Sequence, residues 1–274
     1  MTFALLLALL SGTVNTAVVN MHSKATTDSD VVSQAIYGAP VQYVEETPGW
    51  VKIRTADEYT GWVEATRLKS STKPYASSGQ IAAVSSLFAH IYREASVTKH
   101  QPLLTIPYEA KLEIAAETRQ ENGRWLQVNL VDGSSGWIQQ GDVQLSAQRM
   151  TIPETIELSK RFLGLPYTWG GTSSFGYDCS GFTQMLCRRR AINMPRDAGP
   201  QARWEGVREV TRANLEPGDL LYFGRNLASI THTGYFIGND DFIHATTNGK
   251  PVVQISKLNE EPWTKLFVAA RRPK

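Results

Sequence analysis

A tryptophan repeat in the first half of the chain constrains the fold more than any other feature. Trp50 and Trp62 are twelve residues apart, and Trp125 and Trp137 have the same spacing in a second copy about 75 residues later. Each copy contains short alternating segments, such as Val51-Lys52-Ile53, between turns rich in Gly, Pro, Asp and Asn. Alternation with period two is typical of half-buried strands. The repeat therefore predicts two copies of one small β-barrel.

The pattern changes at Thr151. Helical spacing of apolar residues predicts a helix over 153–163 and a second helix from about Cys179 to Ala191. After Asp219 the period falls to two, which predicts five strands over 219–223, 234–237, 241–245, 252–255 and 266–270. Helices followed by an antiparallel sheet make an α+β domain. We therefore expect barrels over 18–70 and 80–147, a linker from Lys69 to Gly79, and an α+β domain over 151–274.

The N-terminus begins with an apolar run from Phe3 to Leu10, which is too short to span a bilayer. The run and the small residue Ala17 favour a secretory signal over residues 1–17, cleaved near Ala17. The alternative is an apolar start with no export function. We expect a periplasmic or secreted protein with no integral membrane segment.

Composition excludes several classes of function. With 42% hydrophobic and 20% charged residues and a net charge of +2, the chain is typical of a globular protein. No block of Lys and Arg supports nucleic-acid binding. No two histidines have i, i+4 spacing and no Cys-x-x-Cys occurs, so neither a metal nor another cofactor is indicated.

The two cysteines, Cys179 and Cys187, differ in their local setting. Cys179 lies where a Gly-rich loop enters the second predicted helix, and a helix N-terminus lowers the pKa of a thiol. Cys187 lies two turns deeper, where a buried hydrophobic role is expected. Eight helical residues span about 12 Å, whereas a disulfide needs Cα atoms within about 7 Å, so no bridge is expected.

A cysteine hydrolase also needs a base, and His232 and His244 lie twelve residues apart on predicted neighbouring strands. An odd-length loop centred on Gly238, or a bulge, would place both side chains on one face of the sheet. A plain two-residue turn at Asn239-Asp240 would place them on opposite faces. Spacing alone leaves both alternatives open.

Six ordered blocks in residues 151–274 resemble the NlpC family of cell-wall cysteine peptidases. The blocks are Leu165-Pro166-Tyr167-Thr168-Trp169-Gly170-Gly171, Gly176-Tyr177-Asp178-Cys179-Ser180-Gly181-Phe182, Pro195-Arg196-Asp197, Pro217-Gly218-Asp219-Leu220, His232-Thr233-Gly234-Tyr235-Phe236-Ile237-Gly238 and Phe242-Ile243-His244-Ala245. The resemblance implies a papain-like fold with Cys179 as nucleophile, His232 as general base and then acid, and His244 as the orienting residue. It also implies that the Tyr167 hydroxyl and the Cys179 backbone N–H bind the oxyanion.

The first half resembles bacterial SH3-like domains, through the segment from Asp30 to Gly38 and the two Gly-Trp pairs that follow. NlpC-type enzymes with such barrels resemble γ-D-glutamyl-diamino acid endopeptidases of the dipeptidyl-peptidase VI type. That resemblance implies hydrolysis of the γ-D-Glu–diamino acid bond in peptidoglycan stem peptides with a free N-terminal L-Ala.

In that subgroup the first barrel closes the subsite for the free amine. The resemblance implies substrate binding by Asp178 and Ser180, and by Tyr59 and Asp30 of the first barrel. One departure is Ala198, where the subgroup often has a serine. We expect a monomer whose partners are these murein peptides.

Three alternatives remain open at this point. The same chemistry serves a cross-link endopeptidase and an N-acetylmuramoyl-L-alanine amidase. A non-catalytic cell-wall-binding protein is the third. The sequence also leaves open diaminopimelate or lysine as the third residue of the stem peptide.

Overall fold

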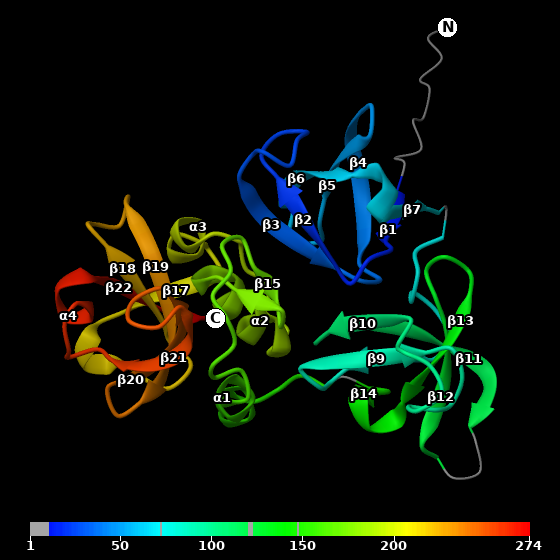
Figure 1. The fold of residues 1–274 in the computed structure, drawn as a ribbon. Coiled ribbons are helices and arrows are strands. Elements are labelled where there is room, and N and C mark those ends of the chain that lie inside the picture. The colour runs from blue at the N-terminus through cyan, green and yellow to red at the C-terminus, as the bar shows by residue number, and fades with distance from the viewer. Residues whose placement is uncertain (1–10, 72, 120–122, 147) are drawn as a thin grey trace, which may run out of the picture. The chain divides into compact units, whose positions relative to one another are not determined.

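The computed structural model describes residues 11–274 except 72, 120–122 and 147. It divides into two compact units, Met1–Ser146 and Ala147–Lys274, which we call the barrel unit and the C-terminal unit (Figure 1). The predicted sequence of folds, all-β barrels and then an α+β domain, is confirmed.

The barrel unit contains two seven-stranded sheets with the same topology. The first has the order β3-β2-β6-β5-β4-β1-β7, and the second repeats it as β10-β9-β13-β12-β11-β8-β14. The first sheet consists of β1 (Ser11–Val14), β2 (Val18–His22), β3 (Val31–Ile36), β4 (Pro40–Thr47), β5 (Trp50–Arg54), β6 (Thr60–Glu64) and β7 (Leu68–Ser70), with a 3-10 turn η1 (Ala65–Arg67). The second consists of β8 (Ile81–Val84), β9 (Phe88–Tyr92), β10 (Leu104–Pro107), β11 (Lys111–Arg119), β12 (Trp125–Asn129), β13 (Ser135–Gln139) and β14 (Val143–Gln144), with η2 (Gln140–Asp142).

The glycine before the second tryptophan of each copy has a steric reason. A Cβ on Gly61 would lie 2.8 Å from Met21 Cβ, and one on Gly136 would lie 2.4 Å from Ile91 Cγ2. Both distances are shorter than van der Waals contact, so only glycine lets the neighbouring strand approach this closely. The repeat thus marks equivalent crowded positions in two barrels.

Tyr37 links the two barrels within their unit. Its ring is buried in the core of the second barrel, and its hydroxyl accepts the Val131 N–H at 2.8 Å. Tyr75, in the predicted linker, meets Tyr37 edge to face with ring centres 6.2 Å apart, and donates to the Asn129 carbonyl. The segment between the barrels is therefore more than a spacer, because Tyr75 packs against the second barrel.

The first barrel begins before the predicted boundary at residue 18. Strand β1 pairs with both β4 and β7, and Val14 is fully buried in the barrel core. Cleavage near Ala17 would remove this strand and its two ladders. Most of the predicted signal, residues 1–10, lies outside the described residues, so export stays a prediction.

The C-terminal unit contains helices packed against an antiparallel sheet of order β17-β22-β18-β19-β20-β21. Its helices are α1 (Ile152–Lys160), α2 (Cys179–Arg189), α3 (Ala198–Ala202) and α4 (Trp263–Leu266), with a 3-10 turn η3 (Arg212–Asn214). Its strands are β15 (Thr172–Ser173), β16 (Gly176–Tyr177), β17 (Val207–Val210), β18 (Leu220–Gly224), β19 (Ile230–Gly238), β20 (Asp241–Thr246), β21 (Val252–Lys257) and β22 (Phe267–Pro273). The two predicted helices and five predicted strands are confirmed. Strand β17, the short β15–β16 hairpin and helices α3 and α4 were not predicted.

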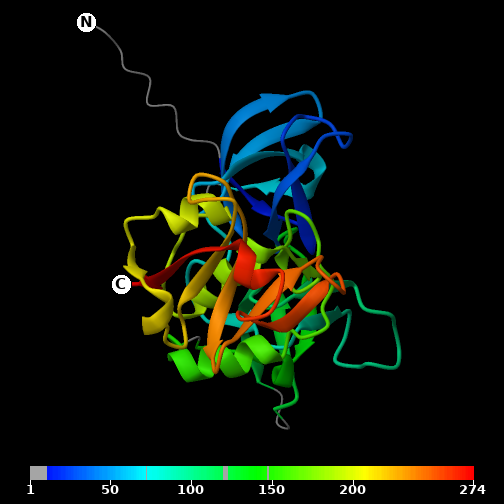
Figure 2. The same ribbon diagram turned by 90° about the vertical axis from the view of Figure 1, so that its left-hand side faces the viewer.

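Local sequence accounts for how the helices start. A capping box begins α1, in which Thr151 accepts the Glu154 N–H and the Glu154 carboxylate accepts the Thr151 N–H. Helix α2, the yellow-green helix labelled in Figure 1, packs against β19 and β20, which belong to the sheet coloured yellow to red in Figures 1 and 2. No helix within the described ranges is long and apolar enough to cross a membrane.

Candidate active site

The start of α2 is built around close backbone packing. Asp178 is the N-cap, and its Oδ1 accepts the Gly181 N–H at 2.7 Å. A Cβ on Gly181 would lie 2.2 Å from the Gly171 carbonyl oxygen, and one on Gly171 would lie 2.3 Å from that of Gly176. The Gly-rich loop and the helix can approach only because these residues are glycines. Cys179 is thereby fixed as the first residue of α2, in a buried position.

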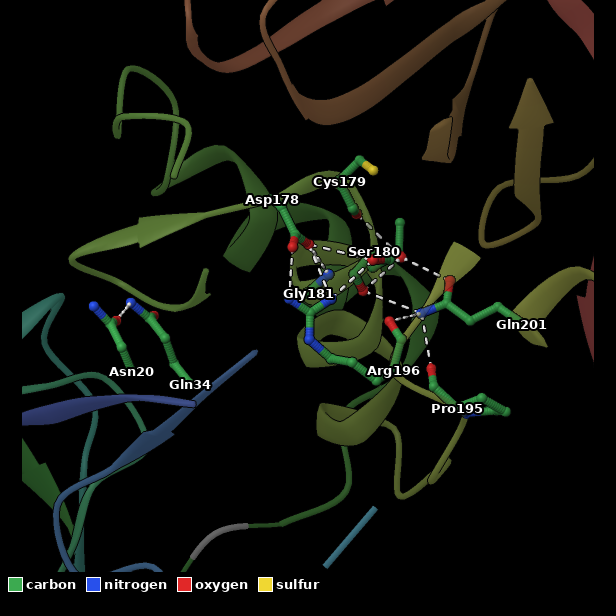
Figure 3. A network of polar contacts seen from close by, with 10 residues as sticks. Asn20, Gln34, Asp178, Cys179, Ser180, Gly181, Pro195, Arg196 and Gln201 are labelled. Atoms are coloured by element: carbon green, nitrogen blue, oxygen red, sulfur yellow. Dashed lines mark hydrogen bonds and ion pairs between the residues drawn. The ribbon is translucent and has the colours of Figure 1, made fainter. Parts of the chain in front are cut away.

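Asp178 also pairs with a buried arginine that sequence analysis assigned no role. Arg196 Nη1 donates to Asp178 Oδ1 at 3.0 Å and Nη2 donates to Oδ2 at 2.5 Å, while the arginine side chain is only 1% exposed. Ser180 Oγ donates to Asp178 Oδ1 at 3.2 Å and accepts from Arg196 Nη1 at 2.8 Å. In Figure 3 this network lies beneath the start of α2 and the Cys179 sulfur points away from it.

Gln201 on α3 ties the arginine segment to the helix. Its Nε2 donates to the carbonyls of Ser180 and Pro195 at 3.1 and 3.0 Å, and its Oε1 accepts from Thr183 at 3.2 Å. The side chain is fully buried, so these bonds are shielded from water (Figure 3). The sequence shows an Arg and a Gln in one short segment, but only the structure shows that both side chains are buried and therefore need partners.

The side chains of His232 and His244 lie on the same face of the sheet and form a hydrogen bond with each other. His232 Nε2 lies 2.7 Å from His244 Nδ1. The hairpin has the two-residue turn, with Asn239 and Asp240 both at positive φ, and it also has a bulge, since the register shifts between Phe236 and Gly238. The turn alone would place the two histidine side chains on opposite faces of the sheet, and the bulge brings them back to the same face. Of the two alternatives that the spacing left open, the structure therefore has the shared face.

Residues missed by sequence analysis enclose the two histidines. Trp263 of α4 stacks on His232, with ring centres 5.0 Å apart and an interplanar angle of 30°, and meets His244 edge to face at 4.8 Å. Phe223 and Phe242 pack against His232 and His244 at 5.7 and 4.5 Å. These aromatic rings contact both imidazoles and shield His244, which is fully buried, more completely than His232, which is partly exposed.

Burial keeps the candidate nucleophile and base neutral. It lowers the pKa of His232 to about 3 and that of His244 well below its usual value, the latter also because of the neighbouring His232. Burial, and then the Asp178 carboxylate, raise the pKa of the Cys179 thiol to about 12. The backbone N–H of Thr233, Arg196 and the backbone N–H of Ser180 act in the opposite direction. The expectation of a lowered thiol pKa was wrong, because desolvation outweighs the helix terminus.

A direct contact between Cys179 Sγ and His232 stays a prediction, since no hydrogen bond found among the described residues joins the two. His232 uses Nε2 for His244, which makes Nδ1 the nitrogen available for the thiol proton.

Tyr167 lies near the thiol. Burial raises the pKa of its hydroxyl, and so do Cys179 and then Asp178, which places the phenol in their electrostatic neighbourhood. The hydroxyl therefore stays protonated and can donate a hydrogen bond. The Cys179 N–H, at the first position of α2, has no acceptor within the helix.

The remaining predicted residues divide between the units. Cys187 is a fully buried free thiol in α2, as expected. Asp30 and Tyr59 belong to the first barrel, where Asp30 is exposed and Tyr59 is half-buried against the barrel core. No cluster of three or more His, Cys, Asp or Glu that could hold a metal occurs in the part of the chain that the structure describes.

Comparison with known proteins places this geometry in a family. Residues 164–272 match the NlpC/P60 family, 17–69 match the bacterial SH3 domain, and 71–144 match the GW (Gly-Tryp) dipeptide domain. The chain is 30% identical over 263 residues to a gamma-D-glutamyl-L-lysine dipeptidyl-peptidase of Bacillus cereus, covering 90% of this chain and 76% of the relative. The chain belongs to the NlpC/P60 family. The predicted family resemblance is confirmed.

Two further comparisons extend over most of the NlpC/P60 chain. A gamma-D-glutamyl-L-lysine dipeptidyl-peptidase of Bacillus subtilis is 30% identical over 256 residues, which is 90% of this chain and 82% of the relative. The structure of an NlpC/P60 family protein from Bacillus cereus superposes with a TM-score of 0.82 at 25% identity, covering 96% of this chain and 99% of the other. The papain-like fold class with preceding SH3-like barrels is thus confirmed.

Proposed function

We propose that this NlpC/P60 protein is a cysteine peptidase that hydrolyses the γ-D-Glu–diamino acid bond of peptidoglycan stem peptides. Cys179 is the nucleophile, His232 the general base and then acid, and His244 the residue that orients His232. The observation that carries the proposal is the 2.7 Å contact between His232 Nε2 and His244 Nδ1, on the sheet strands against which the Cys179 helix packs.

The neutral resting state defines the first step. When substrate binds, the Cys179 sulfur attacks the carbonyl carbon and its proton moves to His232 Nδ1. The resulting imidazolium donates Nε2–H to His244, and the oxyanion is bound by the Tyr167 hydroxyl and the Cys179 N–H. His232 then protonates the leaving amine, and water releases the acyl group by the reverse sequence.

The bond that is cut is proposed from the relatives. The two Bacillus relatives are named for the γ-D-glutamyl-L-lysine bond, and they align with nearly the whole of this chain. The diamino acid in this protein's substrate is accordingly lysine or a related residue. We further propose, from this substrate, that the protein acts in the cell envelope.

The preference for a free L-Ala amine is the finer part of the proposal. Asp178 Oδ2 accepts from Arg196, and a carboxylate oxygen has room for a second donor such as an ammonium. Arg196 already compensates the Asp178 charge, which weakens the attraction of Asp178 for an ammonium group. Substrate binding by Asp30 and Tyr59 stays a prediction from the family resemblance alone. Ser180 Oγ already donates to Asp178, so it can serve the amine only as an acceptor.

Defined peptides test the activity and the bond together. L-Ala-γ-D-Glu-diamino acid peptides, free or acetylated at the amine, are incubated with the protein and the products identified by mass spectrometry. We expect release of L-Ala-γ-D-Glu, loss of activity in Cys179→Ala, and activity within a few-fold of wild type in Cys187→Ala. Cross-linked muropeptides and muropeptides that carry muramic acid are tested in parallel, and cleavage of the cross-link or of the bond between muramic acid and L-Ala would establish the alternative hydrolases. Inactivity on every substrate would leave a wall-binding protein.

A further inference from the structure

The hydrogen-bonded chain that starts at His232 continues to a third strand. His244 Nε2 lies 3.0 Å from Ser256 Oγ, and His244 Nδ1 faces His232. Ser256 stands opposite Phe242 in the β20–β21 register, so its side chain shares a face with those of Phe242 and His244. The side chains of His232, His244 and Ser256, from β19, β20 and β21, thus form one continuous chain of hydrogen bonds.

This hydrogen-bonded chain permits only two arrangements of its hydrogen atoms. A neutral imidazole carries one N–H, so each ring donates from one nitrogen and accepts at the other. If Ser256 accepts from His244 Nε2–H, then His244 Nδ1 accepts from His232 Nε2–H, and His232 Nδ1 carries a lone pair. If Ser256 instead donates, every bond reverses and His232 Nδ1 carries the hydrogen.

Only the first arrangement leaves His232 able to act as a base toward Cys179. Both rings are neutral, because burial holds the pKa of each below its usual value. Among the described residues, the ring contacts to the two imidazoles from neighbouring side chains come from Phe223, Phe242 and Trp263, which carry no charge, and the remaining hydrogen bond comes from the hydroxyl of Ser256. The charged groups nearest the thiol, Asp178 and Arg196, compensate each other. The serine is therefore the polar group that selects between the two arrangements.

We propose that Ser256 is a positioning residue: its hydroxyl accepts the His244 Nε2–H and so holds His232 in the tautomer whose Nδ1 is free to take the thiol proton. The inference rests on the proposed function of Cys179 and His232. Ser256 is half-buried, so its own hydrogen can be donated to solvent while the oxygen accepts. The transferred proton moves from Cys179 Sγ to His232 Nδ1 and stays there until the amine leaves, so His244 and Ser256 neither gain nor lose one.

Nitrogen-15 NMR of the histidine rings in the full chain tests the tautomers directly. In wild type at pH 7 we expect His232 Nδ1 to be unprotonated and Nε2 protonated, with the same pattern in His244. Ser256→Ala removes the acceptor, so both tautomers become populated. Ser256→Thr keeps a hydroxyl and should restore the wild-type pattern.

Kinetics on the free-amine peptide give the second readout. Ser256→Ala should lower kcat about 10- to 100-fold, by analogy with the loss of a group that orients a metal-ligating histidine, with KM changed little. Ile255→Val is the matched control, since it removes one carbon from the neighbouring position of β21, whose side chain points to the opposite face. This control should keep wild-type tautomers and kcat.

Two results would overturn the proposal: a protonated His232 Nδ1 in the wild-type resting state, or unchanged tautomers and kcat in Ser256→Ala. The ring spectra are recorded without substrate. Full activity in Cys179→Ala would therefore refute the proposed function separately, whatever the spectra show about Ser256.

Discussion

Replacing Asp178 by Asn should destabilise the C-terminal unit strongly, for a reason that the structure makes specific. Asn is as good an N-cap as Asp, so the bond from the Gly181 N–H is retained. The change instead removes the negative charge that faces Arg196, whose side chain is 1% exposed. It also turns an amide NH₂ toward Arg196 Nη2, so two donors face each other. The buried Arg196 charge thereby loses the carboxylate with which it forms its ion pair.

Removing one partner of a buried ion pair costs about 3–5 kcal/mol. That is a large share of the roughly 5–15 kcal/mol that stabilises a typical domain. Urea unfolding of the full chain, followed by circular dichroism and tryptophan fluorescence, measures the loss. The double variant Asp178→Asn/Arg196→Met should cost less than the sum of the single changes, because no buried charge is left alone.

Asp241→Asn is the matched control in the same unit. Asp241 pairs with Lys257 at 2.7 Å, but the two side chains are 31% and 47% exposed, so the loss should be at most about 1 kcal/mol. Equal losses in Asp178→Asn and Asp241→Asn would refute the argument that burial makes the Asp178–Arg196 pair essential. If Asp178→Asn loses activity, the loss is evidence about amine binding only when the unfolding measurements show that the variant is still folded.

Three further predictions concern the site and its surroundings. Burial lowers the pKa of both His232 and His244, so the unfolded state binds protons at these residues near pH 6.5 and the folded state does not; stability should therefore fall as the pH drops below 6.5, and urea unfolding should show about 2 kcal/mol less stability from His232 at pH 5 than at pH 7, and a smaller total drop in His244→Gln. Trp263→Ala should cost about 3–5 kcal/mol in unfolding free energy and also reduce kcat, whereas a loss below 1 kcal/mol would mean that the ring does not support the histidines. Iodoacetamide labelling with peptide mapping should modify Cys179 before Cys187, which is fully buried, and the reverse order would contradict the nucleophile assignment.

The sequence by itself determined the features that depend on near neighbours along the chain. Alternation around the paired tryptophans predicted two barrels, and the crowding at Gly61 and Gly136 explains why the repeat retains glycine there. The Gly-rich loop before Cys179 likewise predicted a helix start at that residue. These signals are local, because side-chain periodicity and turn geometry act over a few residues.

The tertiary structure alone decided features that depend on residues far apart. The sequence between His232 and His244 is compatible with the two side chains on the same face or on opposite faces of the sheet. The bulge in the β19–β20 pairing places both on the same face. Burial reversed the expected direction of the Cys179 pKa shift, since desolvation comes from surrounding elements and not from the helix that carries the thiol. Arg196 and Ser256 gained their partners only through folding, because a hydrogen bond requires proximity in space, which spacing along a chain does not supply.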